Sequence, residues 1–190
     1  MRPPSILFGS FIALLVVGGP LGYRLYEHRT FRNFRAVRPG VLYRSGQLTR
    51  DGLMRLIHDF GIRTVIALRD PEMGHKPTWD EERFCSKEEL YYFRLSPKSW
   101  WPTADGPPPA EENVRQFLEI LDDPKYYPVL VHCFAGTHRT GAYCAIYQME
   151  YEHASNDDAI QELFAEGYDN LFAEDDVRGF LKAYVPRWKK

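Results

Sequence analysis

Residues 128–141 read PVLVHCFAGTHRTG and predict how the chain folds around one loop. The apolar run at 128–131 is typical of a short strand buried on both faces. A helix is predicted from about residue 139 to 153, so Cys133 follows the carboxyl end of a strand and Arg139 opens a helix. Backbone amides in such a loop and the helix N-terminus carry partial positive charge. The segment therefore predicts an anion-binding loop with a thiol at its mouth.

The residue types in this loop suit a dianionic phosphoryl group. The positive amides favour the thiolate of Cys133 over the thiol, and Arg139 offers two planar donors that match two phosphate oxygens. Gly136 permits close approach of the backbone. We expect the phosphate to contact the residues of the loop and the helix start: Phe134, Ala135, Gly136, Thr137, His138 and Arg139. The alternative is a buried core thiol and a helix arginine paired with an acid.

The loop resembles the active-site loop of the cysteine-dependent protein tyrosine phosphatase superfamily, whose pattern is His-Cys-x5-Arg-Ser/Thr. Residues 34–47, FRAVRPGVLYRSGQ, resemble the opening of compact dual-specificity-like phosphatases. The resemblance implies that Cys133 attacks phosphorus to give a phosphocysteine and that Arg139 binds the equatorial oxygens. It also implies that Thr140 donates to the departing sulfur and that His132 orients the loop. No metal or cofactor is expected.

The resemblance also implies a general acid, an aspartate some thirty residues before the cysteine. Asp105 lies 28 residues before Cys133 in the stretch WWPTADG at 100–106. The stretch departs from the Trp-Pro-Asp loop of the tyrosine-specific enzymes, because its aspartate comes three residues after the proline instead of one. Asp105 is therefore the predicted acid, with a plain turn residue in an Asp-Gly step as the alternative. Asp70 is a weaker candidate.

The rest of the chain alternates strand and helix patterns. Strands are predicted at 41–43, 64–68, 90–95 and 128–131, and helices near 49–60, 79–87, 111–122, 139–153, 155–167 and 174–184. Residues 96–109 hold five prolines and are predicted to be a loop without regular structure. The order predicts one α/β domain with a largely parallel central sheet flanked by helices. Arg44 and Arg69 end strands, so each is either a substrate contact or a salt-bridged surface residue.

Composition excludes several classes of protein. With 44% hydrophobic and 26% charged residues the 190-residue chain is not disordered, and a net charge of −2 argues against a nucleic-acid binder. Residues 1–40 carry +5, so the remaining residues carry −7 and any anionic substrate needs a local positive site. The three cysteines form no Cys-x-x-Cys, so neither a disulfide framework nor a cysteine zinc site is indicated. The oligomeric state stays open.

The N-terminal segment is apolar. Residues 6–23 contain 18 uncharged residues, barely enough for a helix to cross a bilayer. We expect residues 1–23 to be an uncleaved membrane anchor rather than a cleaved signal, 24–40 a basic linker, and 41–190 the phosphatase domain. The arginines after the apolar run predict a cytoplasmic catalytic domain, with the exported or periplasmic side as the alternative.

The predicted substrate is a phosphorylated protein. In related enzymes, lysines in the loop go with highly charged inositol phosphates, whereas Phe134, Ala135 and Thr137 are uncharged, which favours phosphotyrosine or phosphoserine/threonine. A phosphoinositide or inositol phosphate is the alternative, and the predicted anchor keeps a phospholipid headgroup open. Two other functions compete with this one: a rhodanese-like sulfurtransferase, whose loop is typically one residue shorter, and a non-catalytic phosphate-binding module.

Overall fold

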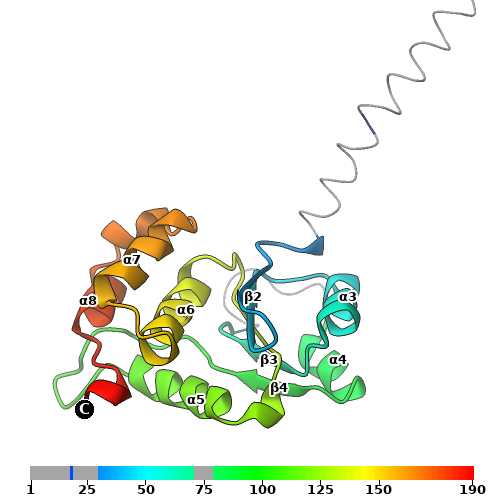
Figure 1. The fold of residues 1–190 in the computed structure, drawn as a ribbon, viewed down its shortest axis with the longest axis horizontal. Helices are drawn as coiled ribbons and strands as arrows, with labels where there is room; N and C mark the ends of the chain where they lie inside the picture. Colours follow the sequence, from blue (N-terminus) through cyan, green and yellow to red (C-terminus); the bar gives the residue numbers. More distant parts are fainter. Residues whose placement is uncertain (1–17, 19–29, 71–78) are drawn as a thin grey trace, which may run out of the picture.

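The computed structural model describes residues 18, 30–70 and 79–190, and these build a five-stranded sheet in the order β1-β2-β5-β3-β4 (Figure 1). The strands are β1 (Arg35–Arg38), β2 (Leu42–Ser45), β3 (Thr64–Ala67), β4 (Tyr91–Arg94) and β5 (Val129–His132). All neighbours are parallel except β1 and β2. The predicted α/β fold with a largely parallel sheet is confirmed.

Helices cover both faces of the sheet (Figure 1). One face carries α3 (Arg50–Phe60) and α4 (Glu81–Lys87); the other carries α5 (Ala110–Asp122) and α6 (His138–Tyr151), with α7 (Asn156–Ala165) and α8 (Asp175–Ala183) beyond α6. The described residues also form the short 3-10 helices η2 (Pro124–Tyr126), η3 (Asp169–Phe172) and η4 (Arg187–Lys189). Successive strand residues point to opposite faces. Leu130 therefore packs in the core under α3 and α4, and Val131 in the core under α5 and α6.

Local signals in the sequence set the ends of α3. The side chain of Thr49 accepts a hydrogen bond from the backbone N of Gly52 at 3.0 Å, as expected of an N-cap residue. Gly61 ends the helix with φ of 66°. Phe60, the last residue of the helix, is 40% exposed, and its ring is tilted by 56° against the rings of Phe34 and Tyr43.

The segment before β2 belongs to the folded body. Residues 35–38, which the sequence placed in a basic linker, form β1 and pair antiparallel with β2. The ring of Phe34 stacks on Tyr43 with centroids 5.7 Å apart. Residues 1–17 and 19–29 of the expected anchor and linker lie outside the described residues.

No helix in the described part of the chain is both long and apolar enough to cross a membrane. The longest helix there, α6, has 14 residues and reaches about 21 Å at ~1.5 Å per residue, short of the ~30 Å of hydrocarbon in a bilayer. On this finding the predictions of a transmembrane helix, of membrane anchoring and of membrane localisation are wrong.

The carboxyl ends of three parallel strands meet at one edge of the sheet. His132, the last residue of the central strand β5, is in register with Ser45 of β2 on one side and Ala67 of β3 on the other. The loop from β5 to α6 starts at this edge. Ligands in open α/β sheets bind at the carboxyl ends of strands, where such loops gather.

Candidate active site

The loop between β5 and α6 wraps around the sulfur of Cys133. This side chain is 4% exposed, and the backbone N–H of Gly136 donates to its Sγ at 3.3 Å. Gly136 has φ of +80°, and a Cβ at this position would lie 2.3 Å from the backbone N of Gly46. Only glycine can let the loop fold this closely against the segment after β2.

The carbonyl groups of the loop are bonded to residues behind it. Three consecutive carbonyls each accept a hydrogen bond from the segment 33–47: Phe134 from the backbone N of Gln47 (2.9 Å), Ala135 from the Asn33 amide (2.7 Å) and Gly136 from the Arg44 guanidinium (2.8 Å). In a trans peptide the N–H points away from the C=O. The N–H groups that follow these carbonyls therefore point to the sulfur side, as the bond from Gly136 to Sγ shows.

The environment of Cys133 favours its thiolate. Burial raises the pKa of the thiol, but the hydroxyl and backbone N–H of Thr140, the N–H of Gly136 and the charge of His132 together hold the pKa below its ordinary value. The side chain of Thr140 is fully buried in the first turn of α6. A thiolate is the nucleophilic form of cysteine, so the site contains an activated nucleophile.

His132 forms a buried ion pair with Glu81 at the start of α4. Its Nε2 lies 3.0 Å from Glu81 Oε2, and its Nδ1 lies 3.3 Å from the carbonyl oxygen of Cys133. Burial opposes both charges, yet the carboxylate raises the pKa of His132 and the imidazolium lowers the pKa of Glu81. Glu81 also accepts from Gln47 at 3.0 Å and from Tyr92 at 3.3 Å. The ring of His132 is thereby fixed beneath the loop.

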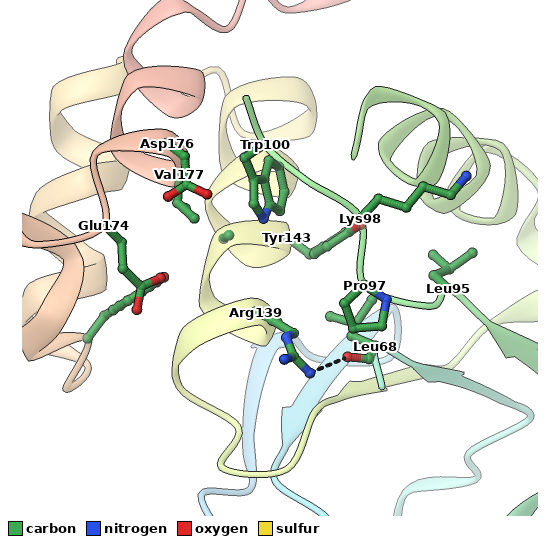
Figure 2. Close-up of a pocket in the computed structure, with 12 residues that line it drawn as sticks. Leu68, Leu95, Pro97, Lys98, Trp100, Arg139, Tyr143, Glu174, Asp176 and Val177 are labelled. Atoms are coloured by element: carbon green, nitrogen blue, oxygen red, sulfur yellow. Dashed lines mark hydrogen bonds between the residues drawn. The ribbon is translucent and has the colours of Figure 1, made fainter. Parts of the chain in front are cut away.

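Arg139 borders a cavity beside the loop (Figure 2). It belongs to the first turn of α6, and its Nη1 donates to the carbonyl of Leu68 at 3.4 Å. The cavity has a volume of about 220 Å³. Figure 2 shows Glu174 and Asp176 on its α8 side and Lys98 on the opposite side. The cavity can therefore hold the organic part of a phosphate ester whose phosphate is bound in the loop. Two carboxylates line its wall.

Two further arginines flank the ring of Phe134. The guanidinium carbon of Arg32 lies 4.2 Å from the ring centroid, and that of Arg69 lies 5.6 Å from it. Arg69 is buried and donates to Gln47 at 2.8 Å; burial lowers its pKa although Glu81 and the Cys133 thiolate oppose the shift. These cations form a local positive region within a domain of net negative charge.

His138, the first residue of α6, contacts Tyr168. Its ring stacks on Tyr168 with centroids 4.8 Å apart and an angle of 23° between the planes. The hydroxyl of Tyr168 donates to Glu174 at 2.5 Å. The loop is therefore joined to the corner between α7 and η3, a contact that the sequence did not indicate.

The proline-rich loop contributes to the cavity through its first half. Trp100 lines the cavity and packs on Tyr143 at 5.8 Å and on Phe180 at 4.9 Å between ring centroids. Asp105 lies farther along, exposed in a tight turn in which Thr103 N donates to Gly106 O at 3.0 Å. Asp105 is not among the residues that line the cavity. The structure does not bring it to Arg139, and its role as general acid stays a prediction.

Two residues of the site were missed by the sequence analysis. Glu81 is only the first residue of a predicted helix, and no spacing relates it to His132, 51 residues later. Arg44 was predicted to be either a substrate contact or a salt-bridged surface residue; it is instead buried behind the loop, where it pairs with Glu166. The one local sign was its place at the carboxyl end of a strand, where the loop lies.

Comparisons with known proteins agree with this geometry. The fold and the loop define a cysteine-based phosphatase of the protein tyrosine phosphatase superfamily, dual-specificity-like type. Residues 32–177 match the model of a family described as DSP-PTPase phosphatase fused to NAD+ kinase, and the chain belongs to this family. The predicted family is confirmed.

Individual relatives are more distant. The chain is 27% identical over 128 residues to the tyrosine-protein phosphatase-like protein OCA2 of Saccharomyces cerevisiae, covering 66% of this chain and 61% of that one. It is 33% identical over 113 residues to the inositol diphosphatase DSP3 of Arabidopsis thaliana, covering 57% and 50%. It therefore spans half to three fifths of these curated relatives.

A solved structure shares the fold. The core catalytic domain of the PP-IP phosphatase SIW14 from S. cerevisiae, in complex with citrate, superposes with a TM-score of 0.62 at 20% identity, covering 82% of this chain and 87% of that one.

Proposed function

We propose that this protein hydrolyses phosphomonoesters through a phosphocysteine intermediate on Cys133. The observation that carries the proposal is the geometry of the loop: the backbone N–H of Gly136 donates to Cys133 Sγ at 3.3 Å, and Arg139 lies in the first turn of the helix that follows. The donors around the sulfur also hold the pKa of the thiol below its ordinary value. Membership of a phosphatase family supports the same reaction. Neither a sulfurtransferase nor a non-catalytic module is favoured by that membership.

The first step transfers the phosphoryl group to sulfur. The Cys133 thiolate attacks phosphorus, so that an S–P bond forms while the P–O bond to the leaving group breaks. The loop N–H groups and Arg139 bind the equatorial oxygens, for which Arg139 exchanges its bond to the Leu68 carbonyl for the phosphate. A general acid, for which Asp105 is our candidate, gives its proton to the leaving oxygen.

The second step returns the enzyme to its starting state. Water attacks phosphorus, the same acid, now a base, takes a proton from the water, and the S–P bond breaks. Thr140 donates to the sulfur as it leaves, which is consistent with its part in holding the pKa of Cys133 low. Inorganic phosphate is then released from the loop.

The substrate that we propose is a phosphorylated protein. The loop side chains Phe134, Ala135 and Thr137 carry no charge. The charged residues that line the cavity are Lys98 and Arg139, which is the arginine that would bind the reacting phosphate, and the two carboxylates Glu174 and Asp176. Two carboxylates repel a ligand with many phosphates, whereas a peptide with one phosphorylated residue meets little repulsion.

An inositol phosphate is the second candidate. Arg32 and Arg69 both lie near the Phe134 ring and supply the positive charge that a ligand with several phosphates needs. DSP3 is described as an inositol diphosphatase and SIW14 as a PP-IP phosphatase.

A trapping experiment tests the proposal. Purified Cys133→Ser protein is incubated with a cell extract, recovered and analysed by mass spectrometry, with wild type as the control. We expect phosphorylated proteins on the variant and none on wild type, which turns them over. Recovery of inositol phosphates alone would contradict the protein substrate. Turnover of thiosulfate but not of p-nitrophenyl phosphate by wild type would contradict the phosphatase reaction.

A further inference from the structure

Arg44 is a buried charge behind the anion-binding loop. It lies in β2 and is 1% exposed. Its Nη2 donates to the carbonyl of Gly136 at 2.8 Å and to that of Thr137 at 3.5 Å. Its guanidinium therefore binds the back of the loop at the point where the loop turns into α6.

Glu166 neutralises this guanidinium. The residue follows the last turn of α7, its backbone N–H donates to Glu162 at 2.9 Å, and its carboxylate pairs with Nη1 of Arg44. Burying an unpaired guanidinium is costly, so Glu166 is what allows Arg44 to lie there. The other oxygen of Glu166 lies 3.5 Å from Arg35, whose side chain is 41% exposed.

We propose that Arg44, held by Glu166, is a positioning residue for phosphate binding, an inference that rests on the proposed phosphatase function. By bonding the carbonyls of Gly136 and Thr137, it turns the N–H groups of Thr137 and His138 to the opposite side, where the phosphate binds. It touches neither the sulfur nor the substrate. The end of α7 thereby helps to set the shape of the phosphate site.

The arrangement requires arginine in particular. One nitrogen of Arg44 bonds the two carbonyls while another meets the carboxylate, which is the fixed fork of a guanidinium. A lysine has a single nitrogen on a flexible stem and cannot hold all three oxygens in this geometry. Gly141 leaves the space, because a Cβ there would lie 2.9 Å from Leu163 and 3.6 Å from the Arg44 guanidinium.

The test compares Arg44→Lys and Glu166→Gln with Arg35→Ala as the matched control. Arg35 contacts the same carboxylate from the solvent side, where an ion pair contributes little. Three quantities are measured: kcat and KM for p-nitrophenyl phosphate, the inhibition constant of inorganic phosphate, and the pH midpoint of Cys133 alkylation by iodoacetamide. Circular dichroism and thermal unfolding report whether each variant folds.

We expect Arg44→Lys to weaken phosphate inhibition and to lower kcat/KM, each by roughly 10²-fold, because small errors in the position of reacting groups cost about this much. The alkylation midpoint should move to higher pH in both Arg44→Lys and Glu166→Gln. Arg35→Ala should stay within about twofold of wild type.

Folded Arg44→Lys with unchanged phosphate inhibition and an unchanged alkylation midpoint would overturn the proposal. If Arg44→Lys does not fold, the nearly isosteric Glu166→Gln decides on the same two readouts. Wild-type protein without phosphatase activity would instead overturn the proposed function. Alkylation and its protection by inorganic phosphate would still test the role of Arg44.

Discussion

The thiol of Cys133 is subject to two opposing effects. Burial favours the neutral thiol, and the donors around the sulfur favour the thiolate; the donors prevail and lower the pKa. The hydroxyl of Thr140 is buried and has no hydrogen-bond partner among the described residues, so it can donate to the thiolate, and together with the backbone N–H of Thr140 it lowers the pKa. The hydroxyl can be removed while the backbone donor stays, so its share can be measured alone.

Thr140→Val should raise the pH midpoint of Cys133 alkylation. A hydrogen bond to the charged form stabilises it, so without the hydroxyl a higher pH is needed for the same fraction of thiolate. Turnover at neutral pH should fall, and more at pH 5.5 than at pH 8. Thr140→Ser, which keeps the hydroxyl, is the matched control. An unchanged midpoint in Thr140→Val would contradict this role.

At the residue scale, the sequence predicted the site residues that are close together in the chain and missed those that come from other elements. The loop between strand and helix contains Cys133 and Gly136, and Arg139 lies in the first turn of the helix after it. Because the three residues are at most six positions apart, their proximity follows from the strand-loop-helix pattern. Glu81 and Arg44 reach the loop from other elements. Their side chains could point elsewhere without any change in the sequence pattern, so only the folded chain identifies them.

At the scale of elements, the His132–Glu81 ion pair joins β5 to α4. Glu81→Gln should destabilise the fold by about 3–5 kcal/mol at pH 5.5, because it leaves a buried imidazolium without its counter-charge. The measurement is denaturant unfolding over a range of pH, with Glu82→Gln as the control, since Glu82 is exposed on the same turn.

The loss in Glu81→Gln should depend on pH in a defined way. The pKa of Glu81 is lowered from 4.5, so its stabilisation is full above 4.5 and is lost as the pH falls through the lower folded value. The pKa of His132 is raised from 6.5, so its stabilisation is full below 6.5 and is lost as the pH rises through the higher folded value. The difference from wild type should therefore be largest between about pH 4.5 and 6.5. A difference that does not change with pH would contradict the ion pair.

The proline-rich loop of residues 96–109 contains the predicted general acid, Asp105. Trp100 anchors one half of this loop, while Asp105 stands exposed in a turn of the other half. Asp105→Asn should lower kcat by roughly 10²-fold or more on phenyl phosphate, whose leaving group needs a proton, and much less on p-nitrophenyl phosphate.

Inorganic phosphate inhibition should be unchanged in Asp105→Asn. Asp123→Asn is the control, because Asp123 lies at the end of α5 and pairs with Lys125. Equal turnover of phenyl phosphate by Asp105→Asn and wild type would move the assignment to another acid, with Asp176 of the cavity wall the next to test.

At the scale of the whole molecule, anion binding is concentrated in one place. Residues 41–190 carry −7, and the loop, Arg139 and the arginines beside Phe134 provide the local positive region. The carboxylates of Glu174 and Asp176 limit that region on the cavity side. This distribution predicts a preference for ligands with one phosphate.

The double variant Glu174→Gln, Asp176→Asn should shift that preference. Removing two negative charges from the cavity wall should raise kcat/KM for inositol polyphosphates relative to a phosphotyrosine peptide, by roughly 10-fold at low salt and less at high salt. Glu111→Gln and Glu119→Gln, at exposed positions of α5, provide a control of equal charge change. An unchanged ratio would contradict the role of the cavity wall.

The alternation of strands and helices predicted the α/β architecture, while strand order required the structure. The sequence gives no sign that β5 inserts between β2 and β3. Short strands of four residues have few side chains with which to specify a neighbour. β1 was missed because its partly exposed RAVR sequence does not look like a buried strand.

The central claim is that phosphate passes through a covalent bond to Cys133. Rapid acid quench of the enzyme with p-nitrophenyl phosphate, followed by mass spectrometry of the peptide that contains residues 128–141, measures this directly. We predict one phosphoryl group on Cys133 in wild type, more of it in Thr140→Val, and none in Cys133→Ser. A fully active enzyme with no phosphoryl group on this peptide, or full activity in Cys133→Ser, would contradict the account.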